Sequence, residues 1–250
     1  MSESGPLYKL VSAAESLSDV QVAVLTRVAE RMHKAFESET YPEQGLGSWR
    51  FFESFGQFLS TFHMFSDVKL TKKMFETFIA DSFRHDGRQA NQVSNSVNAG
   101  ADVIVDGVGI SCKTEGAESM SSGDITISKL MEARWIRECK SSVDVSSRLT
   151  VRIREHVSQY DRILLLRSFG TPPQFRYDLY EIPKRLIESI ASVEATAFSE
   201  PNENHSSGAN IPLLSGSSFR VVLDGSVEKV TIRRLPTSEC VLHGRWRISV

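Results

Sequence analysis

Apolar residues recur at three- and four-residue intervals in three stretches of the first third of the chain, a spacing typical of amphipathic helices. The first stretch opens with a capping-box-like pattern at Ser18 and continues to about Glu37. The second is rich in phenylalanine and covers 51–65, and the third follows Thr71, which can cap a first helical turn. We therefore predict three helices here, with a loop over 38–49 between the first two.

A change from helical to strand-like periodicity marks a β-hairpin near the middle of the chain. Two β-branched runs, 103–105 and 108–110, meet at Asp106-Gly107, a dipeptide that tolerates the positive φ angles of a two-residue turn. The resulting register places Asp102 opposite Ser111 and leaves only apolar residues on one face. The opposite face is polar and carries the candidate chemistry.

Three side chains of this polar face, those of Asp102, Ser111 and Lys113, are expected to converge. Opposed Cβ atoms in a hairpin lie ~5 Å apart and diagonal ones ~7 Å apart. A carboxylate there can bind a hard divalent cation, and a neighbouring lysine can position a water, which suits phosphodiester hydrolysis. An ordinary hairpin with a weak exposed ion pair has the same spacing, so the pattern alone leaves both interpretations open.

The arrangement D-x8-S-x-K-T that begins at Asp102, with Glu76 on a predicted helix upstream, resembles the PD-(D/E)xK nuclease superfamily. Within it, the type II restriction endonucleases are the most similar group. Two positions depart from the family pattern, because Ala101 replaces the name-giving proline and Ser111 replaces the second acid. Some restriction enzymes share the S-x-K form and recruit the missing acid from elsewhere in the chain. Candidates for that acid are Glu76, Glu115 and Glu132.

The resemblance implies roles for individual residues. Asp102 and a second acid would bind Mg²⁺, with the Cys112 carbonyl as a further ligand, and Lys113 would position the attacking water. Glu76 is the first choice for the second acid and Glu115 the second. Ser111 is expected to hydrogen-bond within the site. Glu76 lies at the margin of its helix's buried stripe, so pairing with Lys72 or Lys73 is the structural alternative for this residue.

The remaining pattern fits an α/β restriction-endonuclease-like core, with a mixed central sheet flanked by helices and a β-rich C-terminal tail. The apolar run 163–166 is typical of a strand covered on both faces and would extend the hairpin's sheet. We divide a single domain, 1–250, into N-terminal helices (1–70), a core (71–195) and a β-rich extension (211–250). Other expected elements are a polar linker over 84–98, helices over 127–140, 149–160 and from 183, strands over 162–168, 175–181, 219–223, 227–232 and 240–250, and an exposed mobile segment over 199–210.

Charge gives no global signal for nucleic acid, because the formal net charge is −2. Any DNA-binding surface must therefore be local. Basic residues of the predicted helix 127–140 could follow phosphates, and arginines of the C-terminal strands could read bases, although solvated faces have the same composition. The candidate DNA contacts are Lys129, Arg134, Arg137, Lys140, Arg245 and Arg247.

The resemblance further implies a homodimer on palindromic double-stranded DNA and a cognate DNA methyltransferase in the same host. No apolar run approaches the ~18 residues of a membrane span and no secretory leader opens the sequence, which favours a soluble cytoplasmic protein without membrane contact. Three scattered cysteines without a CxxC pattern indicate reduced thiols. Alternatives are a structure-specific repair or junction nuclease, a catalytically silent DNA-binding protein, and an interaction protein unrelated to DNA.

Overall fold

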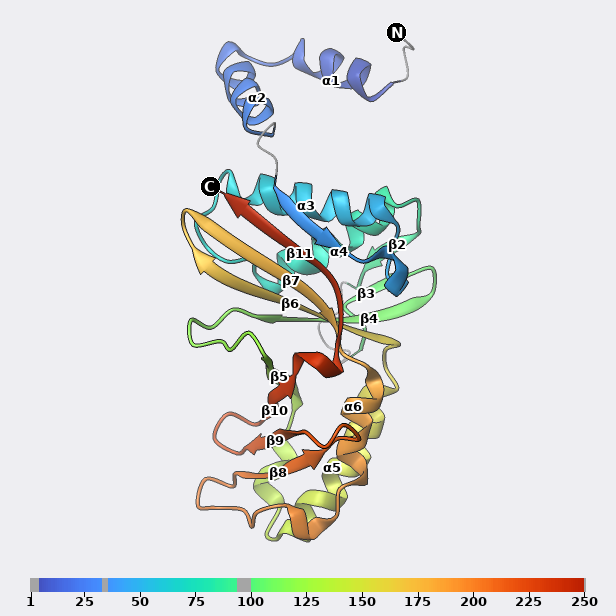
Figure 1. The fold of residues 1–250 in the computed structure, drawn as a ribbon, viewed down its shortest axis with the longest axis vertical. Helices are drawn as coiled ribbons and strands as arrows, with labels where there is room; N and C mark the ends of the chain where they lie inside the picture. The colour runs from blue at the N-terminus through green and yellow to red at the C-terminus, as the bar shows by residue number, and fades with distance from the viewer. Residues whose placement is uncertain (1–4, 33–35, 94–99, 250) are drawn as a thin grey trace.

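Two β-sheets organise the chain in the computed structural model, which describes residues 5–32, 36–93 and 100–249 (Figure 1). The larger sheet has seven strands in the order β1-β11-β7-β6-β4-β3-β2, and it is mixed because β4 and β6 run parallel. This confirms the expected mixed α/β architecture. The strands of this sheet are β1 (Glu37–Thr40), β2 (Ala90–Gln92), β3 (Val103–Val105), β4 (Val108–Glu115), β6 (Arg162–Thr171), β7 (Gln174–Glu181) and β11 (Val241–Ser249).

One face of the large sheet is covered by α3 (Trp49–His63) and α4 (Lys72–His85) (Figure 1). Helix α4 begins where the sequence predicted, because the Thr71 hydroxyl accepts a hydrogen bond from a first-turn amide. Helix α3 begins two residues before the predicted start, because Ser48 caps it in the same way. Their phenylalanine stripes pack with Trp246 of β11 into a largely buried aromatic cluster, with Phe58 and Phe62 partly exposed at its edge. Two further helices, α1 (Pro6–Ala14) and α2 (Asp19–Met32), stand above this layer in Figure 1.

The other face packs against a second core formed by two helices and a four-stranded sheet, in the order β5-β10-β9-β8. The connection from β4 to the parallel strand β6 passes through β5 and α5, so this segment of the chain lies across the face that carries Lys113. The elements are β5 (Asp124–Glu132), α5 (Ser142–Val157), α6 (Lys184–Glu188), β8 (Ser207–Pro212), β9 (Ser218–Asp224) and β10 (Lys229–Pro236).

Short 3₁₀ turns connect these elements. They cover Pro42–Gln44, Arg134–Glu138, Ser189–Ser192, Ala195–Ala197 and Thr237–Glu239. Within the described ranges, no helix has the length and apolar character needed to cross a membrane.

The hairpin has the predicted register, with Val103 opposite Ile110 and Val105 opposite Val108. Asp106 and Gly107 have φ angles of 49° and 86°, as a two-residue turn of this type requires. The apolar strand β6 continues the sheet next to β4, as expected. These features were predictable because they depend on local turn chemistry and alternation.

The predicted helix over 127–140 is wrong. The chain forms β5 up to Glu132 and then a 3₁₀ turn, Arg134–Glu138. Ile127, Leu130 and Met131 have helical spacing, but β5 pairs with β10 through two register shifts, which disturb the two-residue alternation of a regular strand. Tertiary pairing therefore outweighs the local pattern.

Three smaller predictions also need correction. The helix expected to reach Glu37 and the loop expected over 38–49 give way to β1, an exposed edge strand that lacks apolar alternation. The polar linker 84–98 contains β2, although 94–99 lie outside the described residues. The exposed segment 199–210 ends in β8, whose first three residues are buried. In addition, the helix expected over 149–160 begins earlier, at Ser142, because Ser141 caps it.

Candidate active site

The polar end of the hairpin holds Asp102 in a fixed position just outside the strand ladder. Its backbone N–H donates to the Ile110 carbonyl at 2.8 Å. Its Oδ2 accepts a 2.6 Å hydrogen bond from the Cys112 backbone N–H, and the Ser111 hydroxyl lies 3.5 Å from the same oxygen. The carboxylate is thereby anchored through one oxygen, while Oδ1 faces the next group of residues.

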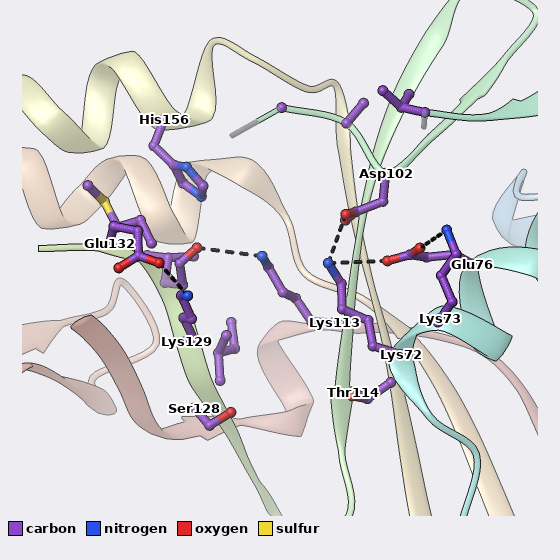
Figure 2. A pocket seen from close by; sticks show the side chains of 16 residues that line it. Lys72, Lys73, Glu76, Asp102, Lys113, Thr114, Ser128, Lys129, Glu132 and His156 are labelled. Carbon is purple, nitrogen blue, oxygen red and sulfur yellow. Dashed lines mark hydrogen bonds and ion pairs between the residues drawn. The ribbon is translucent and has the colours of Figure 1, made fainter. Parts of the chain in front are cut away.

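Glu76 reaches the same place from α4 and is only 8% exposed. The Lys72 ammonium joins the two acids, at 2.8 Å from Oδ1 of Asp102 and 3.3 Å from Oε1 of Glu76 (Figure 2). Lys73 lies 3.4 Å from Oε2 of Glu76. Burial acts to lower the pKa of Lys72, but hydrogen bonding and charge from Asp102 and Glu76 outweigh it and raise that pKa overall. Two carboxylates from different elements thus share one cation.

Lys113 extends from β4 into a cavity of about 590 Å³ that Asp102 and Glu76 also line. Its Nζ lies 3.5 Å from the Leu130 carbonyl of β5, a long contact for a charged donor (Figure 2). Burial lowers the pKa of Lys113, and the positive charge of Lys72 lowers it further. A lysine with a depressed pKa in a cleft is a functional-site candidate.

The structure therefore brings Glu76, Asp102, Ser111 and Lys113 together. Cys112 contributes its backbone, because its thiol is buried on the opposite face of the sheet, where burial raises the thiol pKa well above its usual value. The contact of Cys112 with Asp102 is made by its backbone N–H, and the role of its carbonyl as a ligand stays a prediction.

Glu115 lies away from this cluster and has structural partners. Its carboxylate accepts a 2.7 Å bond from the fully buried guanidinium of Arg167 and a 2.8 Å bond from the Thr126 N–H. Burial raises the pKa of Glu115, although Arg167 opposes the shift. The remaining candidate acid, Glu132, lines the cavity from β5 but is exposed and paired with Lys129.

Among the candidate DNA contacts, only Lys129 lines this cavity. Arg134 and Arg137 approach Glu228 at 3.6 and 3.1 Å, and Lys140 is exposed beyond the 3₁₀ turn. On β11, Arg245 pairs with Asp178 at 2.9 Å and Arg247 approaches Glu37 at 3.5 Å. The six residues therefore do not form one surface, because Arg134 and Arg137 gather at Glu228 and Arg245 and Arg247 lie on β11.

Sequence reasoning missed His156, which lines the cavity from the last turn of α5. Burial lowers its pKa to about 4, with a further contribution from the Lys113 charge. A single histidine far from the hairpin in sequence gives no local signal, because only the crossover between β4 and β6 places it here.

The donor set fits a magnesium ion. No cluster of three or more His, Cys, Asp or Glu side chains suited to a metal occurs within residues 5–32, 36–93 and 100–249. Mg²⁺ commonly binds through one or two carboxylates, together with waters and substrate phosphates. Asp102 and Glu76 supply two carboxylates close enough to share the Lys72 cation, and this observation matches that requirement.

Comparison with known proteins gives a consistent result. Residues 10–248 match the family model SmaI, described as type II site-specific deoxyribonuclease. The chain is 32% identical over 203 residues to the type II restriction enzyme SmaI of Serratia marcescens, and the alignment covers 78% of each protein. No solved structure gives a significant match.

Proposed function

Since the chain belongs to the SmaI family of type II site-specific deoxyribonucleases, we propose that Asp102, Glu76 and Lys113 form a Mg²⁺-dependent active site. The substrate is double-stranded DNA at a defined sequence, and the reaction is phosphodiester hydrolysis. The site has the polar-face arrangement of a PD-(D/E)xK nuclease in its S-x-K form.

One observation supports this proposal most strongly. The Lys72 ammonium contacts a carboxylate of the hairpin and a carboxylate of α4 at the same time. Two acids that are distant in sequence therefore meet around a positive charge beside Lys113. The pairs of Glu76 with Lys72 and Lys73 are those expected of a structural role, but the contact of Lys72 with Asp102 also ties this buried acid to the hairpin.

The residues divide the work as follows. Asp102 and Glu76 would hold Mg²⁺, together with the Cys112 carbonyl, and Glu115 keeps the Arg167 side chain in place. When bound, the ion would neutralise charge that develops on the scissile phosphate and lower the pKa of a bound water. Lys113 orients the attacking water and, as a cation, favours its hydroxide form. Ser111 and the Cys112 N–H orient the Asp102 carboxylate.

The partners follow from the chemistry of a palindromic target. A two-fold homodimer presents the same site to both strands, and a cognate methyltransferase would protect host DNA. The DNA substrate places the enzyme in the cytoplasm. Sedimentation of the protein with its DNA target should give two chains per duplex, whereas a single chain on cleaved DNA would contradict the dimer.

The function is tested by incubating the protein with long duplex DNA of known sequence, with Mg²⁺ or with EDTA. Discrete fragments should appear only with Mg²⁺, and their ends give the recognition sequence. Asp102→Ala and Lys113→Ala should each reduce cleavage by on the order of 10²- to 10³-fold, as for removal of one stabilising group elsewhere. Lys73→Ala is the matched control, since Lys73 is exposed and contacts only Glu76 among the described residues.

Intact DNA would favour a catalytically silent DNA-binding protein. Titration calorimetry then distinguishes a working nuclease from a silent DNA-binding protein. A working site takes up Mg²⁺ saturably and loses this uptake in Asp102→Ala. Full Mg²⁺-dependent cleavage by Lys113→Ala would show that the assignment of the site is wrong.

A further inference from the structure

His156 has an environment that the proposed function does not yet explain. It belongs to α5, is 7% exposed, and lines the cavity that contains Asp102 and Lys113. Figure 2 shows its imidazole pointing from α5 into this cavity, toward the end of the Lys113 side chain, which enters from β4. A polar ring has therefore been placed against the candidate active site from an element that carries none of the residues assigned so far.

The fold alone does not satisfy this ring. The imidazole packs edge-on against Tyr160, with the ring centroids 5.2 Å apart and the planes at 77°. Its Nε2 is buried and has no hydrogen-bond partner among the residues that the structure describes. Buried polar side-chain atoms in native proteins are usually paired, and unpaired ones require an explanation.

Lys113 faces the same cavity, and its ammonium has more N–H donors than acceptors within reach in the part of the chain that the structure describes. Its ammonium has three N–H donors, and its one hydrogen-bonding contact within the described residues is the 3.5 Å approach to the Leu130 carbonyl. Lys113 and His156 line the same cavity. Burial lowers the pKa of His156 to about 4, and the charge of Lys113 lowers it further. At neutral pH the imidazole is uncharged, so it carries one N–H donor and one acceptor nitrogen.

We propose that Nε2 of His156 hydrogen-bonds the water that Lys113 positions for attack on the scissile phosphate. This role makes His156 a further catalytic residue, and it rests on the proposed nuclease function. His156 orients the water and takes no proton from it, since an imidazole of such low basicity is a poor base at neutral pH. The two groups approach one water from α5 and from β4, which fixes its lone pair toward the phosphorus.

The test compares His156→Leu with His156→Gln in the full-length protein. Leucine keeps much of the volume and removes the polar atom, whereas the glutamine amide nitrogen can occupy nearly the position of Nε2. Single-turnover cleavage of DNA with a mapped site, at saturating Mg²⁺, should slow on the order of 10²-fold in His156→Leu, as expected when a reacting group loses its orientation. The dissociation constant for the same DNA in Ca²⁺ should stay unchanged, and His156→Gln should recover a large part of the rate.

Tyr160→Phe is the matched control, because its hydroxyl is also buried and unpaired within the described residues but does not line the cavity. This variant should cleave at the wild-type rate. Wild-type cleavage by His156→Leu would overturn the proposal, and so would weaker DNA binding at an unchanged rate, which would make His156 a phosphate contact. If the wild-type protein itself does not cleave the DNA, the proposed nuclease function is wrong, and the proposed role of His156 is wrong with it.

Discussion

The ammonium of Lys72 lies 2.8 Å from the carboxylate of Asp102, although the two residues come from a helix and a hairpin that approach each other only in the folded chain. The same ammonium reaches Glu76, one helical turn further along α4. A lysine in this position neutralises the two acids when no other cation does so. It therefore competes for the carboxylates that we assign to Mg²⁺.

Removal of this competitor should tighten metal binding. Lys72→Gln should lower the Mg²⁺ dissociation constant roughly fivefold, because a partly exposed pair of this kind contributes about 1 kcal/mol. Titration calorimetry without DNA measures the change. Lys73→Gln should change the constant much less, because the Lys73 ammonium pairs with Glu76 alone within the described residues. Equal affinities for wild type and Lys72→Gln would mean that the metal binds elsewhere.

The two candidate acids should separate into a catalytic and a structural residue. Glu76→Gln should abolish most Mg²⁺-dependent cleavage while leaving the thermal unfolding midpoint within a few degrees of wild type. Glu115→Ala should instead destabilise the fold by about 3–5 kcal/mol, because it leaves the fully buried Arg167 without its carboxylate partner. Urea unfolding and cleavage assays on both variants provide the comparison. Normal cleavage by Glu76→Gln with loss in Glu115→Gln would reverse the assignment.

Stability at acid pH should depend on His156. Its pKa is about 4 in the folded state against an ordinary value of 6.5, so the unfolded state binds more protons between these values. Stability from this group is therefore complete above pH 6.5 and is lost as the pH falls toward 4, with about 2 kcal/mol lost at pH 5.

Two variants check this reasoning. His156→Phe and His156→Gln both lack the titrating ring, so both should lose about 2 kcal/mol less than wild type between pH 7 and pH 5 in urea unfolding. Only the glutamine variant should retain substantial cleavage. A wild-type pH response in either variant would show that another group causes the acid sensitivity.

Close packing between α3 and β11 gives a prediction about stability alone. A Cβ added at Gly56 would lie 2.8 Å from Cδ1 of Trp246 and closer still to the ring of Phe36. Gly56→Ala should therefore destabilise the protein by about 1–3 kcal/mol, even though alanine is the better helix former. Glu53→Ala, on the exposed side of the same helix, should remain within about 0.5 kcal/mol of wild type.

The sequence predicts those parts of the site that local rules determine. Asp102, Ser111 and Lys113 share a face because the turn at Asp106-Gly107 sets the register, and Glu76 is placed by helical periodicity. His156 has no such rule, because its position depends on how the long connection between β4 and β6 folds over the sheet.

The same limit explains the misassigned segment 127–140. Its apolar residues satisfy a helical spacing as well as that of an irregular strand, and only pairing with β10 selects the strand. Chain segments whose partners are distant in sequence cannot be assigned from periodicity alone. The basic residues of this segment therefore lie on a strand and a short turn and cannot form the continuous helical surface expected for phosphate contacts.

The position of β11 has a consequence for the order in which the protein can be assembled during translation. Strand β11 lies between β7 and β1, yet most of the chain is synthesised between β1 and β11. Until Val241–Ser249 leave the ribosome, β1 has no neighbour in the sheet and the helix α3 lacks the indole of Trp246 against which it packs. A nascent chain therefore carries the hairpin and its acids on an unfinished scaffold, and the layer that supports Glu76 closes only after β11 has been synthesised.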